Sequence, residues 1–333
     1  MKHLFILSAC AAITLPPLAA SPIESKVIGS ESCGECHSTA VDSWKQTHHY
    51  KTFEQLHRRP EAREIAEKLG IRRIKSEGLC VQCHYTAKQE EPDLKPAIVA
   101  GVSCESCHGP AKDWLDIHND YGEGVTEASA ESPEHKAMRL QKSVEAGMIL
   151  PSNIYDVASN CFSCHLVPEE QLVNVGGHTA GSSGFELVSW MHGEVRHNFF
   201  RTEGESNADN PIERKRLLFV VGIILDLENS LRGTAIAKEK ATYGITMAQR
   251  ANKMRKKLSQ VNQIASTEEV TAILEIANGV QLKLNNEAEL STAAEKIATL
   301  GREFAENCDP SALAALDPYV PKPEKYKGTP FTP

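Results

Sequence analysis

The short pattern Cys-x-x-Cys-His occurs four times in this chain of 333 residues and constrains it more than any other feature. The four copies are Cys33, Cys36 and His37; Cys80, Cys83 and His84; Cys104, Cys107 and His108; and Cys161, Cys164 and His165. Cysteines at this spacing can form thioethers with the two vinyl groups of haem, and the adjacent histidine then lies under the iron as its proximal ligand. The sequence therefore predicts four covalently bound c-type haems, held by these eight cysteines and four histidines.

Zinc sites and a disulfide framework are the alternative interpretations of paired cysteines. Neither requires a histidine directly after every pair, so the repeated histidine favours haem. Of the 10 cysteines, eight belong to the motifs, Cys10 lies near the N-terminus and Cys308 stands alone. We interpret Cys308 as an inert or buried thiol.

Residues 1–20 have the pattern of a secretory signal peptide, with Lys2 before a mostly apolar stretch and small residues just before Ser21. Because c-type haem is attached outside the bacterial cytoplasm, we expect an exported, periplasmic protein. Residues 7–10 also resemble a lipoprotein cleavage box, so anchoring through Cys10 is a minor alternative.

The remaining chain separates into a haem-bearing part, a haem-free part and a tail. Residues 21–203 contain all four motifs between short helical pieces broken by glycine and proline. Residues 204–309 show long helical patterns, with a helix start at Asn210-Pro211 and a capping box from Ser266 to Glu269. Residues 310–333 form a proline-rich tail, and we expect an extended chain from Pro318 onward. We expect a mainly α fold: a helical, loop-rich tetrahaem domain followed by a helical hairpin or small bundle.

Several individual elements are predicted. Helices are predicted within residues 39–69 with a break at Pro60, around Met138 and Val144, and within 185–200, 217–231 and 247–258. A further helix starts at residues 266–269 and another ends near Asn307, whereas residues 87–97 are predicted to form a loop.

Charge and hydropathy limit the classes of partner. The net charge of −8 argues against general affinity for nucleic acid. The longest apolar run of the mature chain, residues 217–225, is far shorter than the roughly 20 residues that cross a bilayer, so no transmembrane segment is expected. A basic cluster on one predicted helix, residues 250–257, is interpreted as a solvated face, with an acidic partner as the alternative.

Eight histidines of the mature chain lie outside the motifs and are candidates for the distal side of the four irons. They are His48, His49, His57, His118, His135, His178, His192 and His197. Four irons can use at most four of them.

The runs CGECHSTAVDSWKQTHH, CVQCH, GVSCESCHGP and NCFSCHL, with a histidine ten residues after the third motif, resemble the tetrahaem cytochrome c-554 family of ammonia-oxidising bacteria. The resemblance covers about residues 32–197 and rests on the order and spacing of the motifs. It implies a mainly helical fold, haems in closely stacked pairs, three bis-histidine irons and one five-coordinate iron.

The resemblance also implies particular distal ligands. His49 would bind the haem of Cys161 and Cys164, with His48 as the alternative, and His118 would bind its own haem at Cys104 and Cys107. A histidine after the fourth motif would bind the haem of Cys33 and Cys36. We choose His197 over His192 for that role, because two phenylalanines that follow it could pack on a porphyrin edge.

The haem of Cys80 and Cys83 has two possible states, because the family leaves its distal side open whereas this chain offers His178 on a glycine-rich loop. If His178 binds, all four irons are six-coordinate; if it does not, one iron keeps an open position. Between these two, our interpretation is an open or weakly occupied site. We interpret His57 and His135 as surface residues.

Iron with two histidine ligands passes electrons but does not easily bind a substrate. The sequence therefore predicts an electron carrier between a redox enzyme and a downstream cytochrome, with redox proteins as partners and the C-terminal helices as a possible homo-oligomer contact. The alternatives are a reductase of nitric oxide at an open iron, or a subunit of a larger multihaem complex; we favour the carrier over an enzyme.

Overall fold

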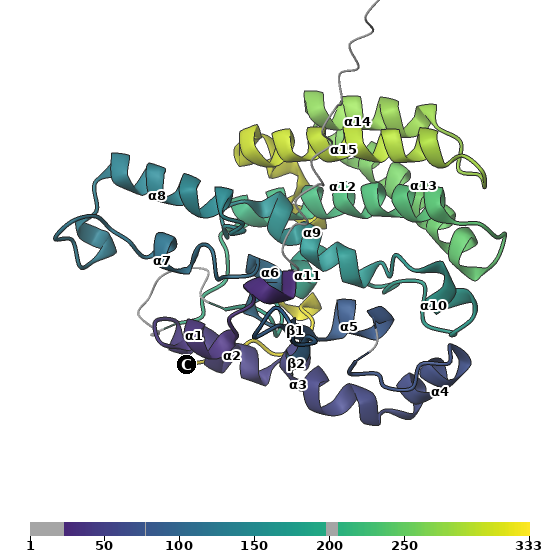
Figure 1. Cartoon of the computed structure of the whole chain (residues 1–333). Coiled ribbons are helices and arrows are strands. Elements are labelled where there is room, and N and C mark those ends of the chain that lie inside the picture. Colours follow the sequence, from purple (N-terminus) through teal and green to yellow (C-terminus); the bar gives the residue numbers. More distant parts are fainter. Residues whose placement is uncertain (1–22, 77, 198–205) are drawn as a thin grey trace, which may run out of the picture.

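The structure is a computed structural model, and it describes residues 23–76, 78–197 and 206–333 (Figure 1). The predicted signal peptide and the two phenylalanines after His197 lie outside these residues. The fold is mainly α, as expected. One short antiparallel sheet pairs β1 (Thr86–Lys88) with β2 (Ala97–Ala100) and flanks the predicted loop.

The haem-bearing part consists of short helices, which are α1 (Ser30–Gly34), α2 (Ser38–Gln46), α3 (His48–Gln55), α4 (Pro60–Lys68), α5 (Gly78–His84), α6 (Cys104–His108), α7 (Leu115–His118), α8 (Pro133–Glu145), α9 (Ile154–His165), α10 (Glu170–Asn174) and α11 (Leu187–Met191). The predicted break is confirmed, since Pro60 lies in the first turn of α4, where a missing N–H leaves no helical bond unmade.

Three of the four cysteine motifs end at the last residue of a helix, namely His84 in α5, His108 in α6 and His165 in α9. The first motif begins in α1 and continues past its end at Gly34. In a helix, residues three and four positions apart share one face, so each of the three helical motifs presents its two cysteines and its histidine on the same side.

The helix predicted within residues 185–200 is shorter than expected, because α11 ends at Met191. The C-terminal tail crosses the chain there: Lys327 donates its N–H to the Ser189 carbonyl at 2.9 Å and accepts from Glu194 N at 2.8 Å. A Cβ at Gly193 would lie 1.9 Å from the Lys327 oxygen, so only glycine allows this crossing.

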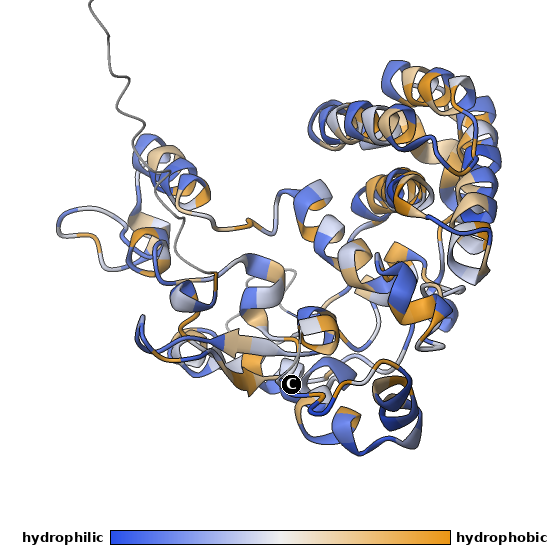
Figure 2. Cartoon of the chain, turned by 45° about the vertical axis from the view of Figure 1, so that its right-hand side comes forward, coloured by the Kyte–Doolittle hydropathy of each residue, from blue (hydrophilic) through white to orange (hydrophobic). Residues whose placement is uncertain are grey.

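Four long helices form the predicted haem-free bundle, namely α12 (Ile212–Ile236), α13 (Thr242–Ile264), α14 (Glu268–Gly279) and α15 (Glu287–Asn307). Thr267 caps α14 by accepting the Val270 N–H, so the helix starts near the predicted place but is capped one residue after Ser266, the cap of the predicted box. Helix α12 is apolar over most of its circumference because it contacts α13 and α15 of the bundle and also α9 and α11 (Figure 2).

The largest hydrophobic core spans both parts of the chain. It joins Phe162 of α9 and Leu187 of α11 to Ile224 of α12. Close packing is required, because a Cβ at Gly222 would lie 2.8 Å from Leu187 and one at Gly301 would lie 2.4 Å from the Tyr155 ring. The bundle therefore supports α9, the helix that carries the fourth motif.

The first part of the tail, before most of the stretch predicted to be extended, is helical. Residues Pro310–Tyr319 form a 3₁₀ helix, η4, whose Leu313 and Leu316 are fully buried against the same core. Burial of these two leucines stabilises the attachment by about 1.5–3 kcal/mol each. None of the helices in the described ranges has the length and apolar composition of a membrane span.

Candidate haem-binding site

Each of the four motif histidines faces one histidine from elsewhere in the chain. The ring centres of His37 and His118 are 6.4 Å apart, those of His49 and His165 are 6.3 Å apart, and the pairs His84–His178 and His108–His197 both measure 6.4 Å. The planes within the pairs are inclined at 35°, 47°, 49° and 88°, in that order.

This common separation is the one expected of two imidazoles that share a metal ion. With metal–nitrogen bonds of about 2.0 Å and ring centres roughly 1.1 Å behind the ligating nitrogen, two opposed rings are about 6.2 Å apart. Two opposed imidazoles are also the axial donor set of a haem iron, since the porphyrin supplies the other ligands. The residues therefore fit four bis-histidine haem sites.

Hydrogen bonds to Nδ1 orient several of these rings. Nδ1 of His108 lies 3.2 Å from the Ile149 carbonyl, that of His178 lies 2.9 Å from Thr179 O and that of His197 lies 2.8 Å from Val195 O. His118 makes the same type of contact with Leu115 O. A carbonyl can only accept, so the proton is on Nδ1 and the Nε2 lone pair is free for a metal.

Burial keeps several of the rings neutral at neutral pH. Desolvation lowers the pKa of both His84 and His165 to about 4, and it also lowers the pKa of His49 and His108. Only a neutral imidazole can bind a metal, so these rings need no proton loss to act as ligands.

The pairing differs in two places from the one that the resemblance implies. His118 lies opposite His37 and not beside its neighbouring motif at His108. His197 lies opposite His108 and not opposite His37. The physical reason is that the short helix α7 places His118 opposite His37, just after α1, so the third motif receives its partner from residue 197. His49 lies opposite His165, as the resemblance implies.

The second motif is not left open in the structure. His178 lies opposite His84 at the same separation as the other pairs, although its loop is exposed. The loop is held to α10, because His178 N donates to Leu172 O at 3.1 Å and Gly177 N to Val173 O at 3.1 Å. This placement contradicts our interpretation of an open site.

The chain is similar in sequence to known c-type cytochromes. Residues 32–109 match the family model described as cytochrome c554 and c-prime. The cytochrome c-554 of Nitrosomonas europaea is 25% identical to this chain over 171 residues, which are 48% of this chain and 66% of the relative. The chain thus spans slightly less than two thirds of that relative's length. No solved structure matches.

The haem-bearing part is similar to the cytochrome c-554 family. This similarity supports covalently bound haem c. The matched segment of the family model contains the first three motifs, and the fourth lies beyond it.

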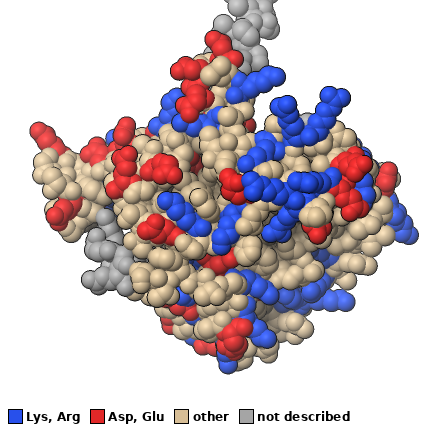
Figure 3. Space-filling view, turned by 90° about the horizontal axis from the view of Figure 1, so that it is seen from below, with Lys and Arg blue, Asp and Glu red and all other residues tan. Residues whose placement is uncertain are grey.

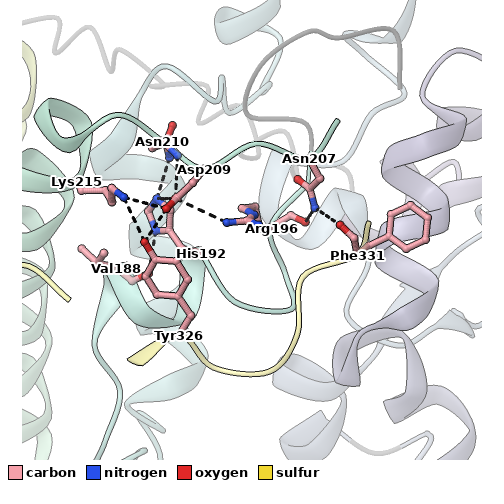
Figure 4. Close-up of polar contacts among 9 residues, drawn as sticks. All are labelled: Val188, His192, Arg196, Asn207, Asp209, Asn210, Lys215, Tyr326 and Phe331. Atoms are coloured by element: carbon pink, nitrogen blue, oxygen red, sulfur yellow. Dashed lines mark hydrogen bonds and ion pairs between the residues drawn. The ribbon is translucent and has the colours of Figure 1, made fainter. Parts of the chain in front are cut away.

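The surroundings of His192 in this chain do not allow it to act as an iron ligand (Figure 4). The residue is fully buried. Its Nδ1 lies 2.8 Å from the Val188 carbonyl and its Nε2 lies 3.1 Å from Asn210 Nδ2. Both ring nitrogens are therefore engaged, and the structure favours His197 as the candidate ligand.

The buried His192 instead belongs to a polar junction around Asp209. This carboxylate accepts hydrogen bonds from Lys215 Nζ at 2.9 Å and from the Tyr326 hydroxyl at 2.8 Å, and it lies 3.8 Å from Arg196 (Figure 4). The junction links α11, the start of α12 and the C-terminal tail. Sequence reasoning missed it, because its members are far apart in the chain.

The other three candidate histidines lie outside the four pairs. Nδ1 of His48 lies 2.7 Å from Glu194 on the surface, and Nδ1 of His135 lies 2.8 Å from Glu131. His57 is half-buried at the end of a 3₁₀ turn. Cys308 is the free thiol of the bundle, and burial raises its pKa to about 11, so it stays protonated at neutral pH.

The helices that carry the motifs follow one another in space in the order α1, α6, α9 and α5, which hold the first, third, fourth and second motif. Helix α6 contacts α1, α9 contacts α6, and α5 contacts α9 (Figure 1). The cysteines agree, since Cys33 lies next to Cys104 and Cys83 lies next to Cys164. Asn160 in α9 also donates to the Cys107 carbonyl at 2.9 Å.

Two polar side chains hold the motif helices together. The Glu105 carboxylate accepts the N–H groups of Ile28 and Gly29 at 2.9 and 2.8 Å and that of Ala111 at 2.9 Å, so it ties the third motif to the segment before α1. The hydroxyl of the half-buried Thr52 lies within hydrogen-bond distance of two carbonyls, 2.7 Å from that of His49 and 2.9 Å from that of His84. No sequence pattern marks either residue.

The helical bundle reaches the fourth motif through one buried ion pair. Arg250 of α13 pairs with Asp226 of α12 at 2.6 Å and donates from Nη1 to the Ser182 carbonyl at 2.8 Å. Ser182 N in turn donates to the His165 carbonyl at 2.8 Å, and its hydroxyl lies 3.5 Å from His165 Nδ1. The ion pair of Arg250 and Asp226 therefore helps to hold Ser182, and through it the ring of His165, in a fixed orientation.

Proposed function

We propose that the protein is a periplasmic tetrahaem c-type cytochrome that carries electrons between a redox enzyme and a downstream cytochrome. One observation supports this proposal above all: each motif histidine is faced by a second histidine, with ring centres 6.3–6.4 Å apart. Four such pairs give every iron two protein ligands, which suits electron transfer and leaves no position for substrate.

In this proposal the residues have separate roles. Covalent attachment falls to Cys33, Cys36, Cys80, Cys83, Cys104, Cys107, Cys161 and Cys164. Axial ligation falls to the pairs His37–His118, His84–His178, His108–His197 and His165–His49. When bound, haem supplies an iron that changes charge by one electron, and the protein sets the spacing, the solvent exposure and the potential of each.

The spatial order of the motif helices supports a linear route. Because α1, α6, α9 and α5 contact one another in that sequence, the sites of Cys33/Cys36 and Cys80/Cys83 are the two ends of the row. An electron accepted at one end would pass through the two middle sites to the other.

Nitric oxide reduction would require an iron with a free position. The placement of His178 opposite His84 argues against such a position at the second motif, which is the site where the family resemblance had suggested one. The carrier is therefore the better supported function.

Rapid-mixing reduction of the purified protein tests the proposal, together with an intact-mass measurement that counts covalent haems. We expect four haems per chain, all reduced on a millisecond scale after an electron enters at any one of them. Fewer than four haems, or irons that do not exchange electrons with one another, would overturn it.

A further inference from the structure

Charge is distributed unevenly along the row of motif helices. Residues 58–75, which form α4 and its two flanking segments, contain seven Lys or Arg and three Glu. Residues 113–134, which contain α7 and the start of α8, hold seven Asp or Glu and neither Lys nor Arg. Residues 58–75 are thus locally basic in a chain whose net charge is −8.

The two segments lie at opposite ends of the molecule. Helices α7 and α8 extend on the left of Figure 1, whereas α4 lies on the right. Seen from below, Lys and Arg gather on the right of the face, and its left edge carries mainly Asp and Glu (Figure 3). We define the basic face as Arg58, Arg59, Arg63, Lys68, Arg72, Arg73 and Lys75.

The basic face covers the second haem site. Ile65 and Leu69 of α4 pack against Leu172 and Val173, the residues of α10 that precede the His178 loop. On the other side, Ile71 packs in the same cluster as Cys80 and Val81 of the motif. The face therefore lies over one end of the row of sites.

Much of this positive charge is available to a partner. Arg58 and Lys68 pair with Glu54 and Glu64 one turn away, on the exposed surface, where such pairs stabilise little. Within the described residues, Arg59, Arg63 and Arg72 are exposed and have no carboxylate at ion-pair distance. A groove of about 790 Å³ lies beside Arg63 and Arg72, and Lys75 and His57 also line it.

From this placement we propose that the basic face is the docking surface for an acidic redox protein, which exchanges electrons at the haem site of Cys80 and Cys83. This inference rests on the proposed electron-carrier function. It adds that the partner is acidic and that it docks at the Cys80/Cys83 end of the row of haem sites. Complementary charge raises the encounter rate and orients the two proteins, and the acidic segment at the far end strengthens that orientation.

The test compares two variants that lose the same three positive charges. One is R59Q/R63Q/R72Q on the basic face, and the control is K253Q/K256Q/K257Q, three exposed lysines of α13 in the haem-free bundle. Because both variants change the net charge equally, a difference between them reports position and not total charge.

Two probes stand in for the partner. A poly-L-glutamate peptide, titrated by calorimetry at low ionic strength, measures binding without electron transfer. Oxidation of the chemically reduced protein by hexacyanoferrate(III), an anion, and by tris(phenanthroline)cobalt(III), a cation, measures the electron-transfer rate.

We expect the basic-face variant to lose about tenfold in affinity for polyglutamate and about fivefold in the rate of oxidation by hexacyanoferrate(III). Its rate of oxidation by the cobalt cation should not decrease. Both losses should disappear at high salt. The control should stay within about twofold of the parent protein. Equal losses in both variants, or no loss in either, would overturn the proposal. Polyglutamate binding does not depend on haem-to-haem transfer, so the result is distinguishable from failure of the carrier function.

Discussion

The rings of His84 and His178 have centres 6.4 Å apart and planes inclined at 49°. The three other pairs have the same separation within 0.1 Å, so the second motif is built like the others. A family resemblance alone would leave this site open. The difference lies in one histidine on a loop whose backbone is fixed to α10 by two hydrogen bonds.

Replacing His178 with alanine is expected to open one iron in four. The haem of Cys80 and Cys83 would lose its sixth ligand, become high-spin and bind added nitric oxide or carbon monoxide. The high-spin bands of the visible absorption spectrum measure the change. His135→Ala is the matched control, because His135 lies outside the four pairs, and a similar spectral change in that variant would contradict the assignment.

His197 and His192 are expected to differ in what their loss affects. His197→Ala should convert the haem of Cys104 and Cys107 to high spin with little loss of stability. His192→Ala should leave every iron low-spin but destabilise the protein by about 2–4 kcal/mol, because it leaves a cavity and unpaired groups at Val188 and Asn210. Spectra and denaturant unfolding of the same two variants separate these effects; a high-spin signal in His192→Ala would reverse the assignment.

Stability is expected to fall as the pH is lowered from 6.5 to 4. Burial lowers the pKa of His192 from 6.5 to about 4. Between these values the unfolded chain binds a proton at this residue and the folded chain does not, so the free energy of unfolding decreases as pH falls, by up to about 3 kcal/mol. Urea unfolding at several pH values, compared with His192→Gln, checks this. A variant with the same pH dependence as the parent would show that His192 is not responsible.

Arg250 is expected to tune the haem of Cys161 and Cys164. Replacing it with glutamine removes a positive charge and leaves Asp226 unpaired, which favours the ferric state and lowers that haem's potential. A charge interaction on the order of 1 kcal/mol corresponds to roughly 40 mV for one electron. Spectroelectrochemical titration measures the shift. Asp226→Asn should move the potential in the opposite direction, and equal shifts of the same sign would indicate a purely structural effect.

The sequence predicted the features that depend on local spacing. The four motifs, the break at Pro60 and the approximate start of α14 are each read within a few residues. The partners of His118 and His197 could not be predicted in the same way, since they depend on how α7 and the segment after α11 pack against α1 and α6. Likewise, the burial of His192 is decided by the tail, which returns more than 100 residues later in the chain to contact it.

Electron paramagnetic resonance of the ferric protein, with spins counted per chain and the spectrum repeated after reduction and addition of nitric oxide, tests the central claim most directly. The account predicts low-spin signals from four irons per chain, no high-spin signal and no nitrosyl species. A high-spin signal from one iron in four that converts to a nitrosyl complex would contradict it and would place an open site in the row.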